Sequence, residues 1–136
     1  MLFRSEILNV FTHNPILGHI TTFGGHPVSC TASLATLEVI LEEQLTSKVE
    51  AKAVLFKTLL QHQHIKAIRN LGLLMAVEFK DFAILHQIIQ KLLALGVMTD
   101  WFLYNDCSMR IAPPLTITEA EITEVCHIIV KCLDTL

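Results

Sequence analysis

The stretch TTFGGHPVSC, residues 21–30, combines two threonine hydroxyls with two glycines directly before a predicted helix. Hydroxyls and the free backbone N–H groups at a helix start attract anions such as phosphate. Gly24 and Gly25 permit a tight bend, and Pro27 suits the first position of the helix. The stretch therefore indicates either a phosphate-binding turn or an ordinary turn that leads into the helix.

The other residues capable of catalysis or metal binding form no recognisable group. His26 has no serine, cysteine or carboxylate at a spacing typical of nucleophilic catalysis, so we expect it to cap the helix or to lie at an interface. The four cysteines, at positions 30, 107, 126 and 132, include no CxxC pair, and three of them lie in apolar patterns. They are predicted to be reduced packing residues, and no metal site is expected.

Composition narrows the range of partners. The net charge is −3 and the sequence has no basic stripe, which argues against nucleic acid and anionic membranes. Residues 7–37 contain no Asp, Glu, Lys or Arg, but they are too rich in polar residues, Gly and Pro to span a bilayer. Counted with Gly and without Tyr, 75 of the 136 residues, or 55%, are apolar, against roughly 45 to 50% on the same count in an average domain. We therefore expect this uncharged stretch to be buried in an interface.

The first residues give an expectation about the compartment. The segment MLFRSEILNVF has Arg4 and Glu6 among its apolar residues, so it has no apolar core of secretory length. We therefore expect the chain in the cytoplasm.

Hydrophobic periodicity predicts the elements that position these residues. Residues 2–11 are predicted to form a short helix, and residues 27–62 a long helix or a helix pair, with a capping box from Ser47 to Glu50. Strands are predicted at 65–69, 73–79, 97–101 and 107–113, with a break at 70–72 and a polar loop at 104–106. Asp81 is predicted to cap a helix over 82–95 that ends at Gly96, and Thr118 and Glu121 to form the capping box of a last helix that reaches residue 136.

This order predicts an α+β fold, with a small, mainly antiparallel sheet packed against helices and preceded by a long helix. We expect one unit of 136 residues in three parts. Residues 1–26 would form an interface segment with the phosphate-contact turn, 27–62 the helix or helix pair, and 63–136 the small α+β domain.

Four segments carry a resemblance to a known family. They are HITTFGGHPVSCTASLATLEVI, IRNLGLLMAVEF, LGVMTD and MRIAPPLTITEAEI. In order and spacing they resemble the C-terminal part of class III aminotransferases, the pyridoxal-phosphate enzymes that include ornithine, acetylornithine and 4-aminobutyrate aminotransferases. The resemblance covers essentially the whole chain and implies the C-terminal small domain of the fold-type I pyridoxal-phosphate-dependent transferases.

The resemblance also implies roles for individual residues. Thr22 corresponds to the threonine that reaches across a dimer interface to the cofactor phosphate of the neighbouring subunit, and Thr21 to the residue whose backbone N–H assists it. Arg110 corresponds to the arginine that receives the α-carboxylate of the amino-acid or 2-oxo-acid substrate through two parallel hydrogen bonds. Arg69 also matches a family position, although Asn70 replaces the usual glycine, and we interpret Arg69 as structural.

The family's Schiff-base lysine and the aspartate that pairs with the pyridine nitrogen have no counterpart here. In the family both precede the TFGG stretch, whereas the 20 residues before Thr21 contain no lysine. Pyridoxal phosphate needs both groups to act as an electron sink. We therefore expect no catalytic residue in this chain, no covalently bound cofactor and no activity of the isolated chain.

Three hypotheses follow for the function. The first is a C-terminal segment of an aminotransferase, partnered by the large domain or by a second copy. The second is a non-catalytic binding or assembly module that completes an active site on a lysine-bearing partner. The third is an unrelated α+β structural domain.

Overall fold

The computed structural model describes residues 4–12 and 21–136. Its contacts divide the chain into two units, Met1–Val39 and Ile40–Leu136. In the first unit, helix α1 covers Ser5–Asn9 and a 3₁₀ turn, η1, covers Val10–Thr12. The predicted helix over 2–11 is thus shorter than expected, and its residues 2 and 3 lie outside the described residues.

Helix α2, Pro27–Glu42, begins in the first unit and ends in the second. It starts at Pro27 as predicted, and none of its residues is buried. Gln44 follows with a left-handed backbone at φ 51°, which interrupts the helix because non-glycine residues tolerate that conformation only singly. A 3₁₀ turn, η2 (Leu45–Lys48), and helix α3 (Val49–Leu59) come next, so the predicted 27–62 segment is a helix pair.

The capping box predicted from Ser47 and Glu50 is wrong. Ser47 lies inside η2, and its hydroxyl donates to the carbonyl of Gln44 at 2.8 Å. The N-cap of α3 is Lys48, which makes no side-chain capping bond. Because the 3₁₀ turn precedes α3, the helix begins one residue later than predicted. Ser47 and Glu50 therefore do not occupy its N-cap and N3 positions.

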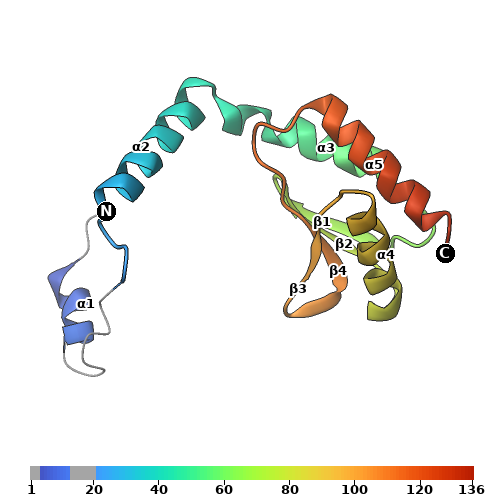
Figure 1. Cartoon of the computed structure of the whole chain (residues 1–136), viewed down its shortest axis with the longest axis horizontal. Helices are drawn as coiled ribbons and strands as arrows, with labels where there is room; N and C mark the ends of the chain where they lie inside the picture. The colour runs from blue at the N-terminus through green and yellow to red at the C-terminus, as the bar shows by residue number, and fades with distance from the viewer. Residues whose placement is uncertain (1–3, 13–20) are drawn as a thin grey trace. The chain divides into compact units, whose positions relative to one another are not determined.

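The second unit contains one antiparallel sheet with the strand order β1-β2-β4-β3. The strands are β1 (Ala67–Leu71), β2 (Leu74–Glu78), β3 (Asp100–Phe102) and β4 (Asn105–Ile111). Helix α4, Phe82–Ala94, connects β2 to β3, and helix α5, Glu119–Leu133, follows β4. The predicted α+β class with a small antiparallel sheet is confirmed (Figure 1).

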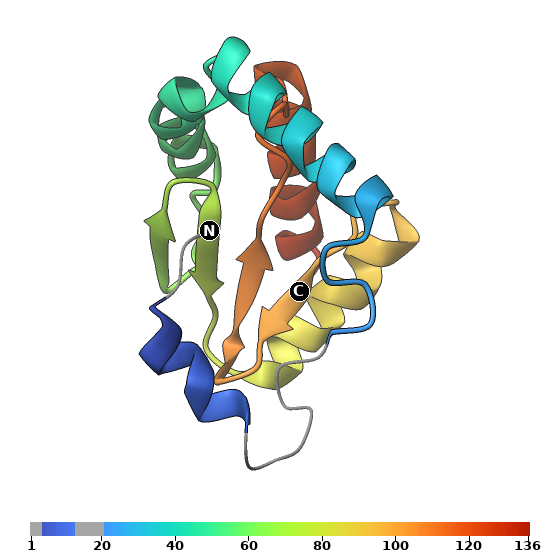
Figure 2. The same cartoon turned by 90° about the vertical axis from the view of Figure 1, so that its left-hand side faces the viewer.

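The hydrophobic core lies on one face of this sheet. Figure 2 shows α4 and α5 behind the strands. Met75, Val77 and Met109 are fully buried on the strands, and alternation places them all on the face that the helices cover. They form one cluster with buried residues of α3, α4 and α5, including Phe56, Leu85, Ile88, Ile122 and Ile129. The other face of the sheet, which these helices do not cover, is called the open face. It carries the alternate residues of the strands, which include Arg69, Glu78, Ser108 and Arg110.

Both hairpins differ from their predicted boundaries. Leu71 pairs with Leu74, so the first turn consists of residues 72 and 73 alone, with Gly72 at φ 57°. Two-residue hairpin turns of this kind accept glycine at positive φ. In the second hairpin, residues 97–99 are not a strand, whereas Asn105 and Asp106, predicted as loop, begin β4.

Three helix-end signals are confirmed. The carboxylate of Asp81 accepts a hydrogen bond from the Ile84 N–H at 3.0 Å, which caps α4. Gly96 has φ 81° directly after the end of that helix. Thr118 and Glu121 form a complete capping box, and the hydrogen bonds from the backbone and then the hydroxyl of Thr118 lower the pKa of the Glu121 carboxyl.

The cysteines are all free in the described structure. Cys126 and Cys132 are buried in the core, as expected for packing residues, and burial raises the pKa of the Cys126 thiol to about 12. Cys30, by contrast, is exposed on α2. Within residues 4–12 and 21–136, no group of histidine, cysteine and carboxylate side chains could hold a metal, and no helix is long and apolar enough to cross a membrane.

Candidate functional site

The TTFGG stretch of the first unit forms a tight turn that leads into α2. The Gly24 N–H donates to the Thr21 carbonyl at 3.4 Å, and the His26 N–H donates to the Phe23 carbonyl at 3.1 Å. Gly25 has φ 75°, a conformation that favours glycine. The His26 carbonyl accepts the first helical hydrogen bond, from the Cys30 N–H at 2.9 Å, so the backbone of His26 occupies the predicted N-cap position.

The hydroxyls of this turn are available to a ligand. Thr21 and Thr22 are both exposed, and neither side chain is hydrogen-bonded to another residue in the described part of the chain. A Cβ at position 24 would lie 1.9 Å from the Thr21 Oγ1, so only glycine leaves that hydroxyl in its place. Exposed hydroxyls on a glycine turn before a helix start fit a phosphate, because they supply neutral donors where the helix dipole favours an anion.

Arg110 lies on the open face of the sheet in the second unit. It is a residue of β4, and its backbone pairs with Ala76 on β2 and with Asp100 on β3. The Thr99 hydroxyl donates to the Arg110 carbonyl at 2.6 Å. A central strand with a partner on each side therefore fixes the backbone from which the guanidinium extends.

The guanidinium of Arg110 is bound to a carboxylate of the same chain. Its Nε donates to Asp100 Oδ1 at 2.8 Å, and its Nη2 donates to Asp100 Oδ2. Both side chains are 46% exposed. Asp100 could not be anticipated from the sequence, because nothing in the pattern around it indicates which residue lies opposite it across the hairpin.

Arg69 lies on the same open face, on the edge strand β1. Its Nη1 contacts Glu78 Oε2, and its Nη2 lies 3.4 Å from the buried Ser108 hydroxyl. Lys66 joins the group through a 2.8 Å ion pair to Glu78. Hydrogen bonds from Lys66 and then Arg69 lower the pKa of the Glu78 carboxyl. These contacts link β1, β2 and β4, which supports the interpretation of Arg69 as structural.

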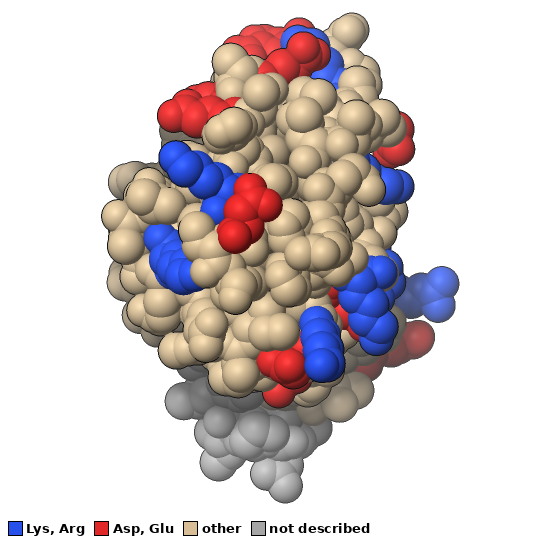
Figure 3. Space-filling model, turned by 90° about the vertical axis from the view of Figure 1, so that its right-hand side faces the viewer, with Lys and Arg blue, Asp and Glu red and all other residues tan. Residues whose placement is uncertain are grey.

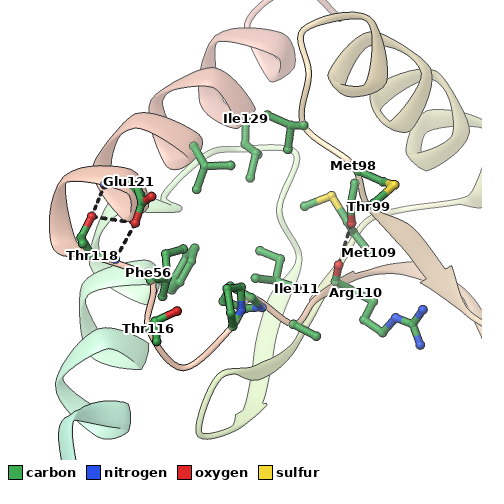
Figure 4. A pocket seen from close by; sticks show the side chains of 16 residues that line it. Phe56, Met98, Thr99, Met109, Arg110, Ile111, Thr116, Thr118, Glu121 and Ile129 are labelled. Carbon is green, nitrogen blue, oxygen red and sulfur yellow. Dashed lines mark hydrogen bonds between the residues drawn. The ribbon is translucent and has the colours of Figure 1, made fainter. Parts of the chain in front are cut away.

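A cavity of about 490 Å³ lies between β4, the segment that follows it and α5. Figure 4 shows its lining, in which Phe56, Met109 and Ile129 are apolar, whereas Thr118 and Glu121 bond to each other at one end. The guanidinium of Arg110 points away from these residues (Figure 4). No sequence signal indicated this cavity, because its walls come from residues spread between positions 56 and 129.

Charged side chains do not gather on the face drawn in Figure 3. Lysine and arginine alternate there with aspartate and glutamate over a mostly uncharged surface. Of the candidate binding residues, Thr21 and Thr22 belong to the first unit whereas Arg110 belongs to the second.

Two solved structures that this chain resembles are aminotransferases. An adenosylmethionine-8-amino-7-oxononanoate aminotransferase from Methanocaldococcus jannaschii is 26% identical with a TM-score of 0.75, over 98% of this chain and 34% of its own. An ornithine aminotransferase from Toxoplasma gondii is 29% identical with a TM-score of 0.76, over 98% of this chain and 32% of its own. The chain thus spans about a third of the length of these proteins.

The sequence model of the Aminotransferase class-III family matches residues 1–133. The match includes the glycine turn with Thr21 and Thr22, the strand that carries Arg110 and all of α5. The chain belongs to the class-III aminotransferase family.

Proposed function

We propose that this chain is the C-terminal segment of a pyridoxal-phosphate-dependent aminotransferase that transfers an amino group between an amino donor and a 2-oxo acid. The family match over residues 1–133 carries the proposal. The exposed hydroxyls of the glycine turn and the guanidinium on the open face of the sheet support it, because they are the two kinds of group that such an enzyme needs for phosphate and carboxylate.

Each residue has a defined task in this proposal. Thr22 donates its hydroxyl to the cofactor phosphate of a neighbouring subunit, with the backbone N–H of Thr21 beside it. Arg110 receives the α-carboxylate and orients the substrate through two parallel hydrogen bonds. The cofactor, when bound, supplies the electron sink for amino transfer. The described residues bind the cofactor phosphate and orient the substrate. The covalent attachment of the cofactor comes from a lysine outside these 136 residues.

Three of the seven lysines of this chain contact other groups of the chain, and none of the seven corresponds to the Schiff-base lysine of the family. Lys52 donates to the Leu115 carbonyl at 2.6 Å, Lys66 pairs with Glu78 at 2.8 Å, and Lys91 donates to the Thr135 carbonyl at 3.2 Å. We therefore expect pyridoxal phosphate to form no single stoichiometric lysine adduct with the 136-residue chain, and the chain alone to show no transamination. Absorbance, borohydride reduction and peptide mapping measure the adduct.

A hybrid enzyme provides the matched positive test. It joins this chain to the lysine-bearing two thirds of a class-III aminotransferase, and we expect it to bind pyridoxal phosphate and to transaminate. One site-specific lysine adduct on the isolated chain that supports turnover would contradict the proposed division of tasks. Scattered weak adducts agree with it, since any exposed amine reacts slowly.

We further propose that the active form is a homodimer, and that the first unit contributes to its interface. Leu34 and Leu37 on α2 are 56% and 53% exposed, in a stretch without charged residues from 7 to 37. Exposed apolar patches of more than a few hundred Å² usually mark interfaces. A second copy, or the large domain of the same protein, would cover these leucines.

Self-association of the 136-residue chain is the expected result. Sedimentation equilibrium at micromolar concentration measures it, and Leu34→Glu with Leu37→Glu should shift the chain towards monomer. The control is Leu71→Glu, which places the same charge at an 86% exposed leucine of β1 and should leave the association unchanged. A monomeric wild-type chain that binds no apolar dye would refute the interface.

A further inference from the structure

The cavity of the second unit is much larger than a gap left by imperfect packing. Protein interiors contain few voids larger than a water molecule, whereas this cavity measures about 490 Å³. That volume lies within the range of small-molecule sites, roughly 300 to 1,000 Å³. Among its lining residues, Met98 is 89% exposed whereas Met109 is fully buried. The cavity thus extends from the surface to the core and has the size and the access of a ligand site.

This cavity is separate from the residues proposed to bind cofactor and substrate. Met109 and Ile111 line it from the face of β4 that the helices cover, whereas the guanidinium of Arg110, between them, points away (Figure 4). Thr21 and Thr22 belong to the first unit, and all the lining residues lie between positions 56 and 129. A ligand of the cavity would therefore occupy neither the phosphate turn nor the guanidinium.

The walls of the cavity suit an apolar molecule. Phe56 from α3, Met109 from β4 and Ile129 from α5 face it (Figure 4). Burial of apolar ligand surface against such walls is favourable, and apolar cavities in proteins do take up apolar molecules. Met98 and Met109 can adjust to the shape of a ligand, because the methionine side chain is flexible and polarisable.

One charged group of the lining can face a ligand. The charged residues of the lining are Arg110, whose guanidinium points away, and Glu121. Glu121 Oε2 accepts from the backbone N–H and the hydroxyl of Thr118, both at 2.7 Å, and Oε1 has no hydrogen bond in the described part of the chain. Those two bonds, the backbone one first, lower the pKa of the Glu121 carboxyl, so it is charged at neutral pH. Oε1 can therefore accept a hydrogen bond from a cationic ligand.

We infer that this cavity is a binding site for a small apolar amine, whose apolar body lies among Phe56, Met109 and Ile129. Its ammonium donates to the carboxylate of Glu121. The site is apart from amino transfer, and the inference does not depend on the proposed roles of Thr22 and Arg110. Because Glu121 is exposed, the ammonium should strengthen binding only about two- to fivefold over an uncharged group of the same size.

The test uses the 136-residue chain and three compounds with one ring system, naphthylethylamine, naphthylethanol and naphthylacetate. Each is titrated while the methyl resonances of the methionines are followed by NMR. Met98 and Met109 should shift, whereas Met75, which is fully buried but does not line the cavity, should not. Naphthylethylamine is expected to bind about two- to fivefold more tightly than naphthylethanol, and naphthylacetate should bind most weakly.

Two variants test the two parts of the site. Glu121→Gln should bind the amine and the alcohol equally, and it should fold, because glutamine also completes a capping box. Val125→Phe should fill the cavity with its ring and abolish the shift of Met109. Its matched control is Val130→Phe, at another half-buried valine of α5 that does not line the cavity, which should leave binding unchanged.

Several outcomes would overturn the inference. If wild type binds amine and alcohol equally, or if the preference for the amine survives Glu121→Gln, then the ligand is not an amine held by this carboxylate. If binding survives Val125→Phe, or is lost equally in Val130→Phe, then the ligand does not bind in the cavity. The titration is repeated on the hybrid enzyme, and loss of binding there would mean that the large domain fills the cavity. Transamination by the hybrid tests the proposed function separately.

Discussion

Valine in place of Thr22 is expected to weaken the retention of pyridoxal phosphate in the hybrid enzyme about ten- to a hundredfold. A hydrogen bond from a neutral hydroxyl to a charged phosphate contributes on the order of 1.5 to 3 kcal/mol, and about 1.4 kcal/mol corresponds to a tenfold change in affinity. Valine keeps the branched shape and removes only the hydroxyl. Because Thr22 is exposed, the substitution should leave folding nearly unchanged.

The cofactor dissociation constant and the melting temperature, measured together, decide this prediction. Thr36→Val is the matched control, because the Thr36 hydroxyl donates to the Ala32 carbonyl at 2.8 Å within the same helix α2 and has no proposed ligand. It should leave cofactor affinity unchanged. A similar loss of cofactor in both variants, with matching drops in melting temperature, would show that Thr22 is only structural.

The local part of the fold could be predicted from the sequence. Asp81, Gly96 and Thr118 end or begin helices through contacts within a few residues, and such contacts depend on spacing that can be read along the chain. Ser47 shows the limit, because the left-handed Gln44 and the 3₁₀ turn after it moved the helix start. Leu45, the first residue of that turn, is buried, and the packing that buries it cannot be read from local spacing.

The candidate site was predictable as single residues but not as a set of contacts. The family resemblance indicated Thr22 and Arg110, because each lies in a segment with a distinctive order of residues. Asp100 could not be predicted as the partner of Arg110, since the pairing depends on the irregular register of the second hairpin, and a one-residue slip in register moves a side chain to the other face. The contact of Arg69 with Ser108, 39 positions away, likewise requires the strand order.

Lysine in place of Arg110 is expected to raise the KM of the hybrid enzyme for a 2-oxo acid about tenfold, with the cofactor still bound. An ammonium keeps the positive charge but cannot form the two parallel hydrogen bonds of a guanidinium, and the loss of one charge-assisted bond is worth at least about 1.5 kcal/mol. The cofactor dissociation constant should not change, because the phosphate is assigned to Thr22. Thr22→Val should therefore weaken cofactor binding, whereas Arg110→Lys should raise the KM for the 2-oxo acid.

Arg69→Lys is the matched control for this prediction. Arg69 is the other arginine on the open face of the sheet, and its guanidinium bonds to Glu78 and Ser108. The control should lower the melting temperature slightly and leave KM unchanged, since those contacts join strands and face no proposed substrate. KM for the 2-oxo acid, the cofactor dissociation constant and the melting temperature are measured for both variants. If Arg110→Lys releases cofactor as readily as Thr22→Val, and both lose the same melting temperature, then Arg110 stabilises the sheet through Asp100 and does not bind substrate.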